Sequence, residues 1–170
     1  DPAIGYPAGQ ALARRLRAAA GSNGIVYPSV RRPGGTCLAA FRPGDIVRCA
    51  NGKTVEILNT DAEGRMVLAD ALAWAASDKP EAMVEYSTLT GACVVALGPT
   101  GAGLFSPSDA LARGLLDAAD AAGERLWRLP LWPEFLEEMK GSHSDLKNLG
   151  GRWGGACNAA AFLSQFVGEV

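Results

Sequence analysis

The sequence lacks several features that would have marked common functional classes. No apolar run is long enough to span a bilayer. The formal net charge is only −2, which argues against a nucleic-acid partner held through its phosphates. There is one histidine, His143, and no nucleophile-elbow motif, so a Ser-His-Asp triad has no support.

Cysteine is scarce and irregularly spaced. The four cysteines, at positions 37, 49, 93 and 157, form no Cys-x-x-Cys pair, which excludes a zinc ribbon or a redox dithiol. The first residues lack the basic and then apolar pattern of a secretory signal. We therefore expect a cytoplasmic protein with reduced, mostly buried cysteines. The sequence begins and ends abruptly, as we expect for a piece of a longer protein.

What is present indicates an ordinary globular core, because 48% of the 170 residues are hydrophobic. Periodicity and capping residues predict helices over 9–20, 65–76, 108–122, 133–141 and 156–167. Strands are predicted over 24–30, 36–41, 45–49, 53–58, 82–88 and 102–105, with Asn51-Gly52 as a hairpin turn. Residues 91–97 fit a helix or a strand, and 142–155 read as a long loop. The alternation predicts an α/β protein.

Two carboxylates stand out in the polar loop that follows the predicted hairpin. Asp61 and Glu63 lie two residues apart, and in an extended segment such residues point the same way. Converging carboxylates repel each other unless a cation lies between them, so a divalent metal is indicated. With Arg65 two residues further on, the pattern suits metal-assisted hydrolysis. The alternative is that Asp61 only caps the next helix, where acidic residues are favoured.

A longer match decides between these interpretations. Residues 59–65, which we call the signature loop, read Asn-Thr-Asp-Ala-Glu-Gly-Arg and resemble the signature of the cytosolic leucine aminopeptidases. The flanking motifs at 42–45, 51–56, 67–72, 87–92, 127–130, 145–148 and 150–155 are similar to that family in the same order. The resemblance covers about residues 42–167. It implies part of an aminopeptidase-type mixed sheet flanked by helices.

The resemblance also implies an activity and a site. Family members hydrolyse N-terminal residues such as leucine from peptides, use two divalent metal ions (manganese or zinc), and assemble as hexamers. Asp61 and Glu63 would be metal ligands, and Arg65 would hold a bicarbonate-like base or polarise the reaction intermediate. Thr88, Leu89 and Gly91 would line the substrate site through their backbone groups.

The sequence departs from the family pattern in two ways. Glu85 and Tyr86 replace an Asp and a small apolar residue, and Cys157-Asn158 replaces a more usual Ile-Thr or Ile-Ser. More seriously, family members carry an upstream glycine-rich segment that supplies a lysine, two aspartates and a second catalytic lysine. Residues 1–41 contain no matching segment. We therefore expect weak metal binding and little activity from this chain alone.

A second resemblance occupies the N-terminal part. Residues 24–31 and 33–37, within 5–43, look like the C-terminal part of a RES domain, a family whose toxin members consume NAD. Ser29 would match the serine of that family's signature. The sequence thus predicts a RES-like helix–strand–strand fragment over 1–43 and a partial aminopeptidase catalytic domain over 44–170. Two alternatives stay open: a fragment of a NAD-consuming RES domain, and a non-catalytic remnant that associates with aminopeptidase subunits.

Overall fold

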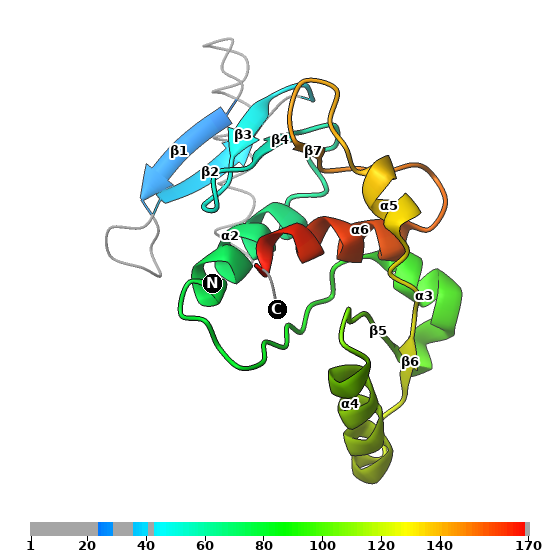
Figure 1. Ribbon diagram of the computed structural model, residues 1–170. Coiled ribbons are helices and arrows are strands. Elements are labelled where there is room, and N and C mark those ends of the chain that lie inside the picture. Colours follow the sequence, from blue (N-terminus) through cyan, green and yellow to red (C-terminus); the bar gives the residue numbers. More distant parts are fainter. Residues whose placement is uncertain (1–23, 29–35, 41–42, 169–170) are drawn as a thin grey trace, which may run out of the picture.

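Helices and short strands alternate along the chain in the computed structural model, which describes residues 24–28, 36–40 and 43–168 (Figure 1). The strands are β1 (Gly24–Pro28), β2 (Thr36–Ala40), β3 (Ile46–Arg48), β4 (Thr54–Glu56), β5 (Ala102–Leu104), β6 (Leu126–Arg128) and β7 (Leu146–Lys147). The α-helices are α2 (Gly64–Ala76), α3 (Gly91–Leu97), α4 (Asp109–Ala122), α5 (Pro133–Glu138) and α6 (Gly155–Leu163). Two short 3-10 helices are η1 (Gly98–Thr100) and η2 (Ser164–Phe166). The predicted α/β class is confirmed, and the predicted helix over 9–20 lies outside the described residues.

The sheet nearest the signature loop combines β3, β4 and β7. β3 and β4 form the predicted antiparallel hairpin, and β7 adds to β4 in parallel. The turn is a three-residue loop: the Gly52 N–H donates to the Cys49 carbonyl oxygen at 2.8 Å, and Gly52 has φ +89°. Only Gly52 takes a positive φ, whereas the sequence suggested that Asn51 would share it.

The main hydrophobic core joins this sheet to α2 and α6, which pack against each other in Figure 1. Its most buried members include Val55 from β4, Met139 after α5, and Phe162 and Phe166 near the C-terminal end, all at or below 1% exposure. Because α2 contributes Ala69 and Leu72 to this core, the helix that follows the signature loop is held firmly in place.

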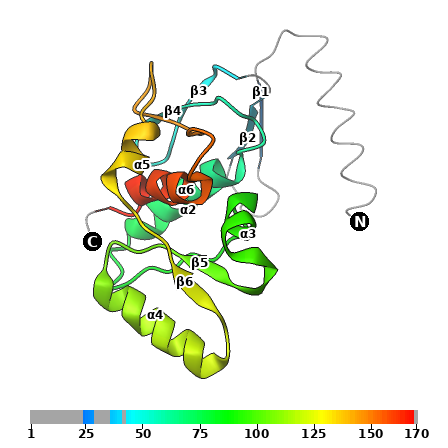
Figure 2. The same cartoon turned by 90° about the vertical axis from the view of Figure 1, so that its right-hand side faces the viewer.

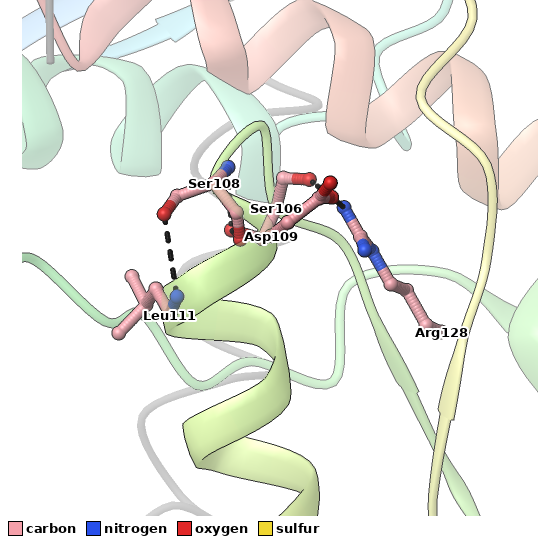
Figure 3. A network of polar contacts seen from close by, with 5 residues as sticks. All are labelled: Ser106, Ser108, Asp109, Leu111 and Arg128. Atoms are coloured by element: carbon pink, nitrogen blue, oxygen red, sulfur yellow. Dashed lines mark hydrogen bonds and ion pairs between the residues drawn. The ribbon is translucent and has the colours of Figure 1, made fainter.

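A second group of elements lies at the far end of the molecule, as Figure 2 shows for β5, β6 and α4. β5 and β6 pair in parallel, and α4 packs against β6. The predicted cap of α4 is confirmed: the Ser108 hydroxyl accepts a hydrogen bond from the Leu111 N–H at 3.2 Å, and Gly123 ends the helix with φ +74°. Arg128 ties β6 to the start of α4 through Asp109 at 2.7 Å and the Ser106 carbonyl oxygen (Figure 3).

Three sequence predictions need correction. The strand expected over 82–88 is wrong, because that segment pairs with no other strand among the described residues. The long loop expected over 142–155 contains β7, which is too short to produce a periodic pattern. The helix expected to end at Gly141 ends instead at Glu138, since the Met139 carbonyl oxygen already accepts a hydrogen bond from the Lys147 N–H at 2.8 Å. Residues 91–97, left open by the sequence, form α3.

The cysteines of the described part agree with the reduced state that the sequence predicted. Cys49 and Cys157 are buried and Cys93 is partly buried, and all three are free thiols. Burial raises the pKa of the Cys157 thiol above its ordinary value. Across the described ranges, no helix has the length and hydrophobicity needed to cross a membrane.

Candidate metal centre

The signature loop is a turn followed by the start of a helix. The Asn59 side-chain Oδ1 accepts a hydrogen bond from the Asp61 N–H at 2.9 Å, and the Asn59 carbonyl oxygen accepts one from the Ala62 N–H at 3.3 Å. Glu63 lies at the N-cap position of α2 with helical dihedral angles, and its side chain makes no capping hydrogen bond. Strand-like alternation therefore does not describe this loop, and the sequence argument for converging carboxylates does not apply in that form. Both Asp61 and Glu63 are exposed to solvent.

A buried amide from a distant part of the chain organises this loop. Asn148, only 1% exposed, accepts hydrogen bonds at Oδ1 from the N–H groups of Leu58 (2.8 Å) and Asn59 (3.2 Å). Its Nδ2 donates to the carbonyl oxygens of Asn59 (2.7 Å) and Ala62 (3.5 Å). One side chain thus satisfies backbone groups at both sides of the turn that carries Asp61.

The sequence placed Asn148 in a matching motif but assigned it no role. Asn148 follows β7, and its own N–H donates to the Glu56 carbonyl oxygen of β4 at 2.9 Å. This pairing brings residue 148 beside residues 58–62. An asparagine after a two-residue strand carries no local signal of such a contact, so only the tertiary structure reveals it.

Arg65 is a buried cation whose partner is missing from the described part of the chain. The residue is 7% exposed, and neither Nε nor Nη1 has a hydrogen-bond acceptor there. Burial lowers the pKa of the guanidinium from its ordinary value because the charged form has lost solvent. Leaving a buried charge unpaired is costly, and Arg65 lies in the first turn of α2, where the helix dipole also favours anions. A buried guanidinium without an acceptor among the described residues has the chemistry to bind an anionic group.

The predicted substrate residues lie on the segment that leads into α3. Leu89 packs against the core, and its Cδ1 lies 3.5 Å from the position that a Cβ on Gly64 would occupy. The structure therefore brings Leu89 beside the signature loop. Thr88 is exposed, and Gly91 begins α3 with open space at its Cα. Ser29 lies outside the described residues.

The donor set fits one side of a metal site. Carboxylate oxygens suit manganese and are accepted by zinc, so Asp61 and Glu63 have suitable chemistry. However, the described residues bring together no group of three or more His, Cys, Asp or Glu side chains that could hold a metal ion. A two-metal centre needs more ligands than these two carboxylates provide. Further ligands would have to come from outside the described part of the chain.

Comparison with protein families gives two overlapping matches. The catalytic domain of the cytosol aminopeptidase family matches residues 33–170, and the RES domain matches residues 1–61. Both resemblances read from the sequence are confirmed. The signature loop falls inside the first match, and the two matches share residues 33–61. The boundary between 43 and 44 that the sequence suggested stays a prediction.

Individual relatives support the first match over most of the chain. A probable cytosol aminopeptidase of Dechloromonas aromatica is 53% identical over 144 residues, which is 84% of this chain and 28% of that protein. Leucine aminopeptidase 2, chloroplastic, of Oryza sativa is 54% identical over 129 residues, or 76% of this chain and 22% of that protein. A solved structure of a tomato leucine aminopeptidase mutant superposes with a TM-score of 0.74 at 52% identity, covering 76% of this chain and 26% of its own. The chain thus spans only 22–28% of the length of these relatives.

Proposed function

This chain belongs to the cytosol aminopeptidase family, and on that basis we propose that it is part of a metal-dependent aminopeptidase that releases N-terminal residues such as leucine from peptides. The observation that carries the proposal is the match over residues 33–170, which contains the complete signature loop. The buried, unpartnered guanidinium of Arg65 supports it, because a structural arginine would normally be paired.

Each predicted residue has a role in this proposal. Asp61 and Glu63 hold divalent ions, manganese or zinc, which supply Lewis-acid chemistry when bound. Arg65 holds an anionic base or the oxyanion that develops on the substrate carbonyl. The backbone groups of Thr88, Leu89 and Gly91 orient the peptide. The position of Leu89 beside Gly64 supports the last assignment, since it puts the substrate segment next to the metal-binding loop.

The chain by itself should have little or no activity, because only two of the ligands are present in its described part. The test is hydrolysis of leucyl-p-nitroanilide by the pure chain with added manganese. We expect turnover no greater than that of an Asp61→Asn, Glu63→Gln double variant. Robust turnover that a chelator abolishes and the double variant lacks would show that the chain holds a complete site.

The same proposal extends to the location, the substrates and the assembly of the whole protein. We propose a cytoplasmic location, peptide substrates and assembly as a homo-oligomer, which is a hexamer in the family that the sequence resembles. The relatives carry the word cytosol in their names, which agrees with this location. Alternatively, the chain is a non-catalytic remnant that binds aminopeptidase subunits. Size-exclusion chromatography with a full-length relative tests this, and a strict monomer without co-elution counts against both the oligomer and the remnant.

The match to the RES domain supports a second candidate function. As a RES-type fragment the chain would consume NAD, with Ser29 in its site. The experiment is to follow NAD loss with the chain and with Ser29→Ala. Loss that depends on Ser29 supports this function, and unchanged NAD removes it.

A further inference from the structure

The loop between α5 and β7 folds back on itself and leads to Asn148 (Figure 1). Lys140 and Leu146 form an antiparallel bridge across this loop, which we call the 140–148 segment. The turn is tightly packed at Gly141, where a Cβ would lie 2.7 Å from the Leu146 carbonyl oxygen, closer than a side chain can approach. Because the segment is this compact, a contact that anchors it also fixes the position of Asn148 at its end.

Asp145 anchors the 140–148 segment to β4. Its Oδ2 accepts hydrogen bonds from the Thr54 N–H at 2.8 Å and from the Thr54 hydroxyl at 2.7 Å. Its own N–H donates to the Thr54 hydroxyl oxygen at 3.0 Å. The hydrogen bonds that it accepts from Thr54 keep the pKa of the Asp145 carboxyl below its ordinary value, so the carboxylate is ionised at neutral pH. These three hydrogen bonds define which residue of β4 lies next to Asp145.

Glu56 provides a second anchor two residues further along β4. The Glu56 N–H donates to the Ser144 hydroxyl oxygen at 3.1 Å, and the Glu56 Oε2 accepts a hydrogen bond from the Ser142 N–H at 3.3 Å. Together with the Asp145 contacts, these hydrogen bonds hold β7 in one register against β4.

That register decides where the side chain of Asn148 points. The Asn148 N–H donates to the Glu56 carbonyl oxygen at 2.9 Å, which continues the pairing beyond β7. Leu146 and Asn148 are both buried, at 4% and 1% exposure, whereas Lys147 between them is only half-buried. This is the alternation of a strand, so a slip of one residue would turn the Asn148 amide away from the signature loop.

The signature loop needs the Asn148 amide because its own carboxylates do not hold it in shape. Asp61 and Glu63 are exposed and carry like charges, so they repel each other rather than stabilise the turn. The Asn148 amide bonds the backbone of residues 58, 59 and 62, on both sides of Asp61. Metal ligands must be held within about 0.5 Å of their working positions. Groups behind the ligands therefore change metal affinity, typically by about 10–100-fold.

We propose that Asn148 and Asp145 are positioning residues for the metal ligands Asp61 and Glu63. Asn148 holds the signature loop in shape from behind. Asp145 acts through Asn148, because it anchors the segment that carries Asn148 to Thr54 of β4. Neither positioning residue is itself a metal ligand. The inference rests on the proposed function, which assigns Asp61 and Glu63 to the metal ions.

The Asp145→Ala variant of the 170-residue chain tests the remote half of this proposal. Asp145 is exposed, so the variant should fold, and its thermal melt checks this. The readouts are NMR order parameters of the amides at 59–63 and manganese affinity, measured from the paramagnetic broadening of the same signals. We expect the order parameters to fall from about 0.85 towards 0.6. Manganese affinity should fall by about three- to tenfold. Unchanged order and affinity overturn the proposal.

Two further substitutions serve as rescue and control. Asp145→Asn keeps an acceptor oxygen for Thr54, so both readouts should return to those of the parent chain. Asp109→Ala removes another exposed aspartate, which pairs with Arg128 at 2.7 Å beside α4. This control should change neither the order of residues 59–63 nor the manganese affinity. A control as damaging as Asp145→Ala would show that the effect is not specific to the 140–148 segment.

A double variant shows whether Asp145 acts through Asn148. Asn148→Ala alone should lower manganese affinity by about tenfold or more. In the Asn148→Ala background, Asp145→Ala should cause no further loss, whereas additive losses would contradict the proposed route. If Asn148→Ala does not fold, the comparison of Asp145→Ala with Asp145→Asn decides the proposal without it.

Failure of this inference can be told apart from failure of the proposed function. If manganese broadening in the parent chain survives Asp61→Asn combined with Glu63→Gln, these carboxylates are not the ligands. The metal site of the proposed function and this inference are then both wrong. If broadening depends on the two carboxylates but neither readout responds to Asp145→Ala, the metal site stands and only the positioning role is wrong.

Discussion

Asn148 and Arg65 are both buried polar residues, but they differ in whether their side chains have hydrogen-bond partners among the described residues. Asn148 uses both ends of its amide on the backbone of residues 58–62. Arg65 is nearly as buried but has unpartnered nitrogens among the described residues. The first arrangement stabilises the loop, whereas the second costs stability. Sequence reasoning identified Arg65 from its motif, but Asn148 required knowledge of which strands are neighbours.

The Asn148 contacts predict a large loss of stability on truncation. Asn148→Ala leaves the Leu58 and Asn59 N–H groups without an acceptor in a partly buried setting, so the free energy of unfolding should fall by about 2–3 kcal/mol. The matched control is Asn51→Ala. Asn51 also bonds two backbone groups, the Lys53 N–H and the Gln165 carbonyl oxygen, but on the surface. That control should cost only about 0.5–1 kcal/mol. Urea denaturation measures both, and equal losses would contradict the role of Asn148.

Cys49 predicts a loss of stability at high pH. Burial, the negative charge of Asp70 and a hydrogen bond to Asp70 raise the pKa of the Cys49 thiol from its ordinary value of 9.0 to about 12. Because the folded pKa lies above the unfolded one, the thiol contributes stability that is complete below pH 9. It is lost as pH rises from about 9 towards 12, where only the unfolded state ionises. The urea concentration at the unfolding midpoint should therefore decrease as the pH is raised from about 9 to 11.

The control for this pH dependence is Cys49→Ala, which removes the ionising group but keeps the other groups that titrate at high pH. The fall in midpoint over the same range should be smaller in this variant. If the variant and the parent chain decline in parallel, Cys49 is not the cause.

Elements with strong local signals were predicted well, and those that depend on neighbours were not. The hairpin around Gly52 and the helix between Ser108 and Gly123 have turn and cap residues whose chemistry is local. The strand expected over 82–88 had the right composition, and its exposure alternates from 82 to 86. A strand also needs an adjacent strand, which the described chain does not supply. β7, with two residues, has no periodicity to detect.

The same Gly→Ala substitution should change the free energy of unfolding in opposite directions at two positions. Gly52 has φ +89° and open space around its Cα, so Gly52→Ala introduces only backbone strain and should cost about 1–2 kcal/mol. Gly114 lies inside α4, also with open space, and Gly114→Ala should raise stability by about 0.5–1 kcal/mol through helix propensity. Thermal or urea unfolding of the pair provides the measurement. Changes of the same sign would contradict the turn geometry or the helix.

At the scale of the whole molecule, the sequence predicted the family, and the family match confirms that resemblance. It also predicted that the metal site would be incomplete, but it did not predict the unpartnered Arg65 side chain or the unpaired backbone at 82–89. Arg65 lacks an acceptor, residues 82–89 lack a neighbouring strand, and no third metal ligand joins Asp61 and Glu63 within the described ranges. These three features agree with the proposal that the chain is part of a larger aminopeptidase.

The most direct test of this account is a manganese titration, followed by electron paramagnetic resonance, of the chain alone and of an equimolar mixture with the upstream portion of the Dechloromonas aromatica relative. The account predicts weak binding by the chain alone. In the mixture, affinity should rise by more than about tenfold, a gain of about 1.4 kcal/mol, and Asp61→Asn with Glu63→Gln should abolish that gain. Tight binding by the chain alone, or a gain in the mixture that survives both substitutions, would contradict it.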